Sequence, residues 1–166
     1  MDTTRFLLSL AQMALAIAGF SGILIAFIRT PGKLTDLERY RLQWLFGPSF
    51  GAMFLALLPT TFQVVDLPAS LAFRIASGAL AAFTVIWYAS QIGPTRRHLR
   101  ETPAIFQRRT LYGLAAGHVV SAAFQTTAAA GAWGDRVEGI FACGIVWLLF
   151  TAAYQFSRIL FVRPDE

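Results

Sequence analysis

"FLLSLAQMALAIAGFSGILIAFI", residues 6–28, is the stretch that decides the fold class of this chain. It runs for 23 residues without a single Asp, Glu, Lys or Arg. A helix needs about 20 mostly apolar residues to cross the hydrocarbon core of a bilayer. A secretory signal has a shorter apolar core behind a basic segment, whereas only Arg5 precedes this run. We therefore predict that residues 6–28 form a transmembrane helix.

Four more stretches have the same character, at residues 42–65, 68–92, 110–132 and 137–162. The composition agrees, since the chain is 56% hydrophobic and only 14% charged, with a mean hydropathy of +0.57. A soluble domain has about a quarter of its residues charged, so lipid must solvate much of this surface. The sequence predicts an all-α fold, a single polytopic transmembrane helical bundle of residues 1–166 with five spans.

The positive charges indicate how this bundle sits in the membrane. Of the 14 Lys and Arg residues, eleven fall at alternate connections and at the C-terminal end: Arg29, Lys33, Arg39, Arg41, Arg96, Arg97, Arg100, Arg108, Arg109, Arg158 and Arg163. Arg5 and Arg136 fall on the other side, and Arg74 lies within a span. Because cytoplasmic loops carry the excess of Lys and Arg, we predict an outside N-terminus and a cytoplasmic C-terminus. Aromatic residues typical of a membrane interface gather on the predicted cytoplasmic side: Tyr40, Trp44, Trp87, Tyr88 and Tyr112.

Local signals mark the ends of several helices. Residues 35–38, Thr-Asp-Leu-Glu, form a capping-box pattern that starts the second helix before the membrane. Thr102-Pro103 predicts that the fourth helix also starts early. Proline is expected to bend the second span at Pro48 and Pro59. Two connections are so short that their spans must form antiparallel hairpins, at residues 66–68 and 131–136.

Ser21 raises the question of catalysis, because residues 19–22, Gly-Phe-Ser-Gly, have the G-x-S-G form in which rhomboid-type intramembrane proteases carry their nucleophile. The only intramembrane base for it is His118. The chain has one span fewer than the minimal rhomboid core and no matching His- and Asn-bearing segment. Ser21 also belongs to a stripe of small residues with Ala14, Ala18 and Gly22. Small side chains let helices approach closely in lipid, so the stripe favours a packing seam.

The fourth span carries a second ladder of small residues, Gly113, Gly117 and Ser121, at a spacing of four. This pattern is typical of close helix packing. Two alternatives stay open: the partner helix belongs to the same chain, or it belongs to a second copy in a homo-oligomer.

Polar side chains on a neighbouring stripe of the same span, His118 and Gln125, are candidates for an intramembrane site. Gln12 on the first span and Gln155 on the fifth are plausible hydrogen-bond partners for them. Such groups commonly link helices to one another in lipid. The alternative is that they line a path for a ligand or ion.

Arg74 is the costliest residue within a predicted span, and an intramembrane charge is by default a functional hypothesis. It lies six residues from Pro68, about 9 Å along the helix, so its guanidinium can reach the outer interface. There it can pair with Asp66, Asp135 or Glu138. An anion site or a pore-lining role is the alternative.

No chemical constellation points to an enzyme or a bound cofactor. Asp and Glu are absent from the interior of every predicted span, which weakens a proton-coupled transporter. One cysteine, Cys143, excludes an intrachain disulfide and a Cys-rich metal site. The basic run at residues 96–100 is a topology signal that can also bind anionic lipid headgroups. It lacks interleaved aromatic residues, so we expect no nucleic-acid binding.

The segments "AGFSGILIAF" (18–27), "YRLQWLF" (40–46) and "FLALLP" (54–59) resemble a family of small bacterial multi-pass membrane proteins of uncharacterised activity. The resemblance implies a location in the bacterial inner membrane and implies no functional residue. We expect a non-enzymatic membrane protein that acts through the lipid bilayer, protein partners or a larger assembly. The alternative is a small homo-oligomeric channel or transporter component lined by Gln12, His118 and Gln125. An intramembrane serine protease is the least favoured hypothesis.

Overall fold

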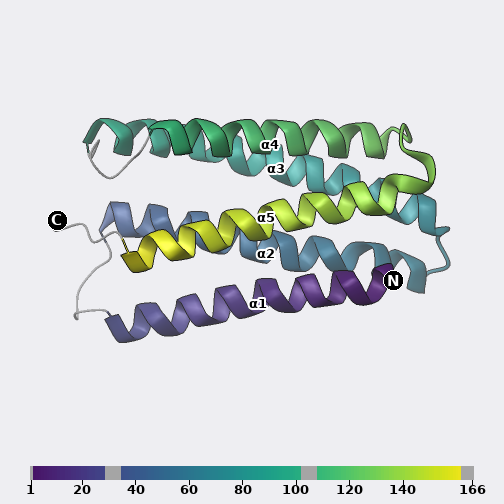
Figure 1. The fold of residues 1–166 in the computed structure, drawn as a ribbon, viewed down its shortest axis with the longest axis horizontal. Coiled ribbons are helices and arrows are strands. Elements are labelled where there is room, and N and C mark those ends of the chain that lie inside the picture. Colours follow the sequence, from purple (N-terminus) through teal and green to yellow (C-terminus); the bar gives the residue numbers. More distant parts are fainter. Residues whose placement is uncertain (1, 29–34, 102–107, 162–166) are drawn as a thin grey trace.

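The computed structural model describes residues 2–28, 35–101 and 108–161, with the side chains of all of these except 24–28 and 161. These residues form five α-helices: α1 (Thr3–Ile28), α2 (Asp36–Val64), α3 (Ala69–Glu101), α4 (Arg108–Ala129) and α5 (Val137–Phe161). A short 3-10 helix, η1 (Gly134–Arg136), precedes α5. The helices lie side by side along one long axis (Figure 1), which confirms the all-α prediction.

Four of the five helices are long and apolar enough to cross a membrane: α1, α2, α3 and α5. The chain is therefore a multi-pass membrane protein by length and composition. The helix α4 is not among these candidates, although the sequence predicted five spans. Its 22 residues are long enough, but they include His118, Gln125 and several glycine, serine and threonine residues, so its most apolar segment is less apolar than those of the other four helices.

The helix α5 lies at the centre of the bundle and packs against each of the other four helices. The helix α1 packs on α2 and α5, whereas α4 packs on α3 and α5. Figure 1 shows α1 and α4 on opposite sides of the bundle, with α2 and α5 between them. The core joins these helices through fully buried side chains such as Leu7, Leu80, Phe141 and Ile145.

The start of α2 confirms the capping-box prediction. The Thr35 hydroxyl accepts a hydrogen bond from the Glu38 backbone N–H at 3.2 Å, and the Glu38 carboxylate accepts one from the Thr35 N–H at 2.8 Å. The helix then continues through Pro48 and Pro59, which are both fully buried. The predicted start at Thr102-Pro103 lies outside the described residues. The helix α3 runs past its predicted end, through Pro94 to Glu101, as a polar extension beyond the apolar segment.

Two tight turns make the predicted hairpins. At the end of α2, Leu67 N–H donates to Phe62 C=O and Asp66 N–H to Gln63 C=O. At the end of α4, Ala132 and Gly131 donate in the same way to Thr127 and Ala128. Both are Schellman motifs, which need a residue with positive φ just after the helix. Asp66 (φ 61°) and Gly131 (φ 88°) supply it, so both predicted hairpins are confirmed.

Asp66→Gly is expected to raise the free energy of unfolding by about 0.5–1 kcal/mol, because glycine adopts positive φ without the steric cost of a Cβ atom. Unfolding in mixed micelles, followed by the fluorescence of the four tryptophans, measures the change. Asp66→Ala is the matched control and is expected to give no gain. A loss of stability in Asp66→Gly would contradict the expectation.

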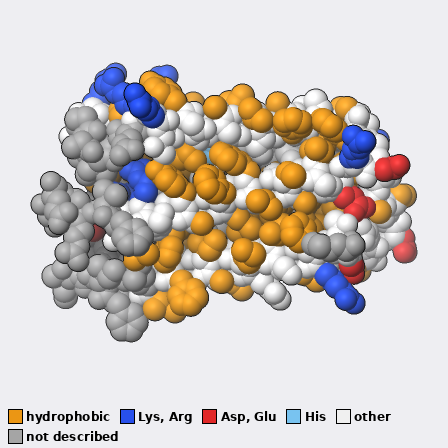
Figure 2. Space-filling view, in the orientation of Figure 1, with side chains coloured by type: hydrophobic (Ala, Val, Ile, Leu, Met, Phe, Trp, Pro, Cys, Tyr) orange, Lys and Arg blue, Asp and Glu red, His pale blue; other side chains and the backbone are white. Residues whose placement is uncertain are grey.

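The two ends of the bundle differ in their charged side chains. Figure 2 shows an apolar band along the middle, with arginines at one end and a mixture of acidic and basic residues at the other. We call the end where α2 and α4 begin the basic end; its described charged residues are Arg39, Arg41, Arg96, Arg97, Arg100, Arg108, Arg109 and Arg158, together with Asp36, Glu38 and Glu101. The opposite end carries Arg5, Arg74 and Arg136 together with Asp2, Asp66, Asp135 and Glu138.

Candidate functional site

The imidazole of His118 on α4 is enclosed by one aromatic ring from each of three neighbouring helices. Its ring centroid lies 6.1 Å from that of Trp44 on α2, 5.5 Å from Tyr88 on α3 and 5.7 Å from Trp147 on α5. The Tyr88 ring is stacked on the imidazole, and both indoles meet it edge to face. Only 2% of His118 is exposed. We call these four residues the His118 cluster.

The polar atoms of the His118 cluster are incompletely hydrogen-bonded. Nδ1 of His118 lies 2.7 Å from the Leu114 carbonyl oxygen, so Nδ1 is the donor in the neutral ring and Nε2 is the acceptor. Among the described residues, Nε2 of His118 and the indole nitrogen of Trp147 have no hydrogen-bond partner, although both atoms are buried. Each is therefore a buried polar group whose lost contact with water is not compensated by a hydrogen bond within the described residues.

Only part of this cluster follows from the sequence. Trp44 and Tyr88 are predicted to lie near the membrane interface, and in the structure their rings contact His118 and Trp44 is buried. Trp147 is not among the predicted site residues. A signal was present, because Trp147 lies about 16 Å from Arg158 along its helix and His118 lies about 14 Å from Arg109. The two residues therefore sit at similar depth from the basic end.

Ser21 and His118 are not brought together. The Ser21 hydroxyl is buried and donates a hydrogen bond to the Ile17 carbonyl of its own helix, at 2.5 Å. Its helix α1 packs on α2 and α5, away from α4 on the far side of the bundle (Figure 1). The G-x-S-G segment thus places its serine in a helix contact, without the histidine beside it.

Gln125 links α4 to α5. Its side-chain amide donates to the Ile140 carbonyl oxygen at 2.7 Å, and a Cβ atom at Gly144 would lie 2.5 Å from the same amide nitrogen. Gly144 is therefore the residue that lets Gln125 reach the backbone of α5. Gln12 lies exposed on α1, and Gln155 is buried on α5. Within one chain the structure does not assemble Gln12 with His118 and Gln125.

The predicted packing seams are only partly within the chain. Ala14 and Ala18 are buried, whereas Gly22 is exposed and no described atom lies within 4 Å of a Cβ atom built on it. On α4, Gly117 packs directly under the Trp147 ring, while Gly113 faces open space in the same way as Gly22. Ser121 is half-buried.

A further small-residue pair, missed in the sequence, joins α2 to α3. Gly47 lies directly under the Trp87 ring, and Gly51 lies under the Phe83 ring. The two rings are stacked on each other with a centroid distance of 6.3 Å. The G-x-x-x-G spacing of residues 47–51 was the available signal for this contact. The intervening Pro48 instead favoured the prediction of a bend in the second span.

The Arg74 side chain contacts the C-terminal end of α4. Among the described residues it forms none of the predicted ion pairs. Its Nε donates to the Ala129 carbonyl oxygen at 3.1 Å, and a Cβ atom at Gly131 would lie 3.1 Å from its guanidinium carbon. Cations near a helix C-terminus are favourable, because the last carbonyl groups there lack partners and carry partial negative charge. This contact accounts for Arg74 as a helix cap.

Arg74→Gln is expected to lower the free energy of unfolding by about 0.5–1 kcal/mol, because the last turn of α4 loses its charged donor. Arg136→Gln, at the same end of the bundle, is the matched control and is expected to change it by less than about 0.5 kcal/mol. Denaturation in mixed micelles measures both variants. Equal effects would show that the contact with Ala129 contributes nothing.

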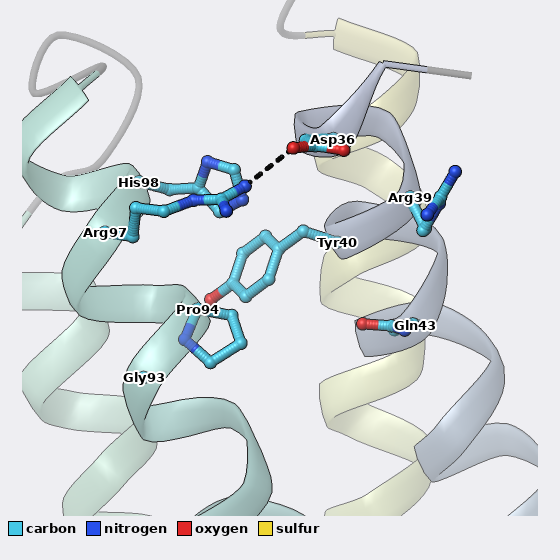
Figure 3. A pocket seen from close by; sticks show the side chains of 8 residues that line it. All are labelled: Asp36, Arg39, Tyr40, Gln43, Gly93, Pro94, Arg97 and His98. Carbon is cyan, nitrogen blue, oxygen red and sulfur yellow. Dashed lines mark hydrogen bonds and ion pairs between the residues drawn. The ribbon is translucent and has the colours of Figure 1, made fainter. Parts of the chain in front are cut away.

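A pocket of about 440 Å³ opens at the basic end, between the first turns of α2 and the polar extension of α3. Figure 3 shows its lining residues: Asp36, Arg39, Tyr40, Gln43, Gly93, Pro94, Arg97 and His98. We call it the basic-end pocket. Across it, Arg97 Nη2 lies 2.9 Å from Asp36 Oδ2.

The basic-end pocket is connected to the His118 cluster by aromatic contacts. The Tyr40 ring lies 4.9 Å from the His98 ring and 6.4 Å from the Trp44 ring. The Tyr40 hydroxyl is 2.6 Å from Thr95 Oγ1, which fixes the ring between α2 and α3. Side chains in contact thus run from the pocket wall to His118. No group of three or more metal-ligating side chains lies within the parts of the chain that the structure describes.

Comparisons of the chain with models of protein families, with curated proteins and with solved structures find no match. The family resemblance of residues 18–27, 40–46 and 54–59 therefore stays a prediction. The length and apolar character of α1, α2, α3 and α5 establish a multi-pass helical membrane protein.

Proposed function

We propose that this chain is a non-enzymatic protein of the bacterial inner membrane, with five spans, an outside N-terminus and a cytoplasmic basic end. It acts through protein partners, lipids or a larger membrane assembly. The observation that carries the proposal is the uneven charge of the two ends, since arginines dominate the end that also holds an open pocket. Excess positive charge marks the cytoplasmic side of inner-membrane proteins.

The placement of α4 supports its crossing the membrane as the fifth span. It lies alongside α3 and α5 between the same two ends, and its 22 residues extend about 33 Å, slightly more than the hydrocarbon core. Its most polar side chains, His118 and Gln125, are buried against the other helices. Its exposed side chains include Val119, Val120 and Phe124, which suit contact with lipid.

Labelling of single cysteines in intact cells tests this topology. In a Cys143→Ala background, Thr3→Cys and Asp135→Cys are expected to react with a membrane-impermeant maleimide. Arg100→Cys is expected to react only after permeabilisation. Protection of Asp135→Cys in intact cells would show that α4 does not cross, and labelling of Arg100→Cys would reverse the orientation.

Crosslinking in native membranes tests the partner role. A photoreactive residue at Arg39 or Arg100, on the basic end, is expected to capture one specific second protein. The same residue at Arg5, on the opposite end, is the control. Failure to recover any specific protein from the basic end would count against the partner hypothesis.

A homo-oligomeric channel or transporter component is the second candidate, and Gln12 favours it. This amide lies exposed on α1 and forms no side-chain hydrogen bond within the described residues. A polar side chain facing lipid gains by hydrogen bonding to another helix. Gln12→Leu is therefore expected to shift the purified protein from oligomer to monomer, and His118→Ala to change flux in liposomes. A strictly monomeric wild-type protein without flux in liposomes would contradict the channel hypothesis.

A further inference from the structure

We propose that the basic-end pocket binds a phosphate group, supplied by an anionic phospholipid headgroup or by a soluble phosphate. This inference rests on the function proposed above, because it needs the basic end to lie at the cytoplasmic membrane surface. It deepens that function by naming the ligand chemistry and the residues that recognise it.

The donors of the pocket suit a phosphate group. Arg97 presents a guanidinium across the cavity, Gln43 contributes a side-chain amide, and His98 is a buried ring on the wall (Figure 3). Arg39 also lines the pocket, but its guanidinium points away from α3 on the outer side of α2 (Figure 3), so Arg97 is the guanidinium that faces the cavity. Guanidinium groups bind phosphate oxygens through paired, charge-assisted hydrogen bonds.

The shape of the pocket also suits a small ligand. Gly93 forms part of the wall, and no atom of the described residues lies within 4 Å of a Cβ atom built on it. The rings of Pro94 and Tyr40 line the cavity beside it. The volume of about 440 Å³ falls within the range of small-molecule sites, so one headgroup with its glycerol fits.

The pocket lies at the depth of lipid headgroups. It is formed where α3 continues past Pro94 into a polar segment and where α2 has not yet entered its apolar segment. Basic residues just outside a span attract anionic lipids.

The Asp36 carboxylate competes with a bound phosphate for the Arg97 guanidinium. Its carboxylate holds Arg97 at 2.9 Å, and Glu101 lies 3.7 Å from the same guanidinium. A bound phosphate has to share or replace Asp36 at Arg97. Removal of the Asp36 charge should therefore tighten phosphate binding, which is the opposite of what loss of a structural ion pair would do.

Lipid binding by the purified full-length protein tests the proposal, with native mass spectrometry as the readout and phosphatidylglycerol or phosphatidylcholine as the probe. Wild-type protein is expected to retain phosphatidylglycerol preferentially. Arg97→Gln is expected to reduce this retention about fivefold, because it removes the charge that faces the cavity. Arg96→Gln is the matched control, since Arg96 is an exposed neighbour on α3 that does not line the pocket. Its expected effect is less than twofold.

Two further variants keep the test independent of folding defects. Asp36→Asn is expected to raise phosphatidylglycerol retention, and Gly93→Met is expected to abolish it by filling the cavity. Gly113→Met, at an equally open glycine on α4, is the control for Gly93→Met. Competition with inorganic phosphate distinguishes the sources: displacement of phosphatidylglycerol from the wild-type protein by inorganic phosphate indicates a soluble phosphate, whereas retention of the lipid under the same conditions indicates the headgroup.

Two results would overturn the site. Equal losses in Arg96→Gln and Arg97→Gln would show a diffuse basic surface without a pocket ligand. Equal retention of both lipids, with no effect of inorganic phosphate and no loss in Arg97→Gln, would show that the pocket recognises neither an anionic headgroup nor a phosphate. Neither result alters the cysteine-labelling pattern, which tests the proposed topology separately.

Discussion

Gly117→Ala is expected to lower the free energy of unfolding by about 2–3 kcal/mol, the largest effect of any single methyl group added on α4. A Cβ atom at this position would overlap the six-membered ring of Trp147. The indole is rigid and also packs against His118, so it cannot turn aside without leaving the His118 cluster. The added methyl group therefore has to push α4 and α5 apart, which breaks close packing along the contact.

Gly113→Ala is the control, because Gly113 lies one turn earlier on the same helix and faces open space. Alanine has the higher intrinsic helix propensity, so this variant is expected to gain up to about 1 kcal/mol. The two variants add the same atoms to the same helix and should change stability in opposite directions. Equal effects would show that the contact between Gly117 and Trp147 does not limit the packing.

The measurement is denaturation in mixed micelles, with Trp147→Phe as a second-site test. Phenylalanine shortens the ring system that overlaps the added methyl group. Trp147→Phe should therefore recover part of the loss caused by Gly117→Ala. Additive losses in the double variant would contradict the proposed overlap, because residues in contact are expected to show coupling.

The sequence predicted what depends on local chemistry and missed what depends on helix rotation. The apolar length of residues 6–28, the capping box at Thr35 and the turn at Asp66 follow from neighbouring residues alone. Each is present in the structure. Which side of a helix faces the bundle depends on partner helices far away in the sequence. Lipid-facing and buried positions are both apolar here, so hydropathy does not separate them.

Gly22 and Gln12 illustrate this limit. The sequence predicts a helix contact at Gly22 and a polar site or channel lining at Gln12 without saying whether the partner helix belongs to the same chain, and both residues lie exposed on α1. Arg74 illustrates a second limit, since its partner is a backbone carbonyl at the end of α4, and every residue type offers one. Trp147 shows what could have been found, because a large ring at the depth of a glycine on a neighbouring span indicates a contact.

His118→Ala is expected to lower the free energy of unfolding by about 2–4 kcal/mol, because removal of the ring leaves a cavity among three aromatic side chains. His118→Leu restores most of the volume and should cost less than about 1.5 kcal/mol. The free energy lost in His118→Leu is small because the imidazole makes few hydrogen bonds. Nε2 has no partner among the described residues, and Nδ1 contacts only the backbone of its own helix. Denaturation in mixed micelles measures both variants.

The leucine variant then separates the two interpretations of the His118 cluster. If His118 only fills space, leucine fills the same space. Partner capture and phosphatidylglycerol retention by His118→Leu should then match those of the wild-type protein. If instead Nε2 of His118 hydrogen-bonds a polar ligand or ion, His118→Leu should remain folded but lose flux in liposomes or partner capture. Tyr88→Phe is the matched variant, because it keeps the ring stacked on the imidazole and removes only a hydroxyl. A change confined to His118→Leu would assign the function to the imidazole nitrogen.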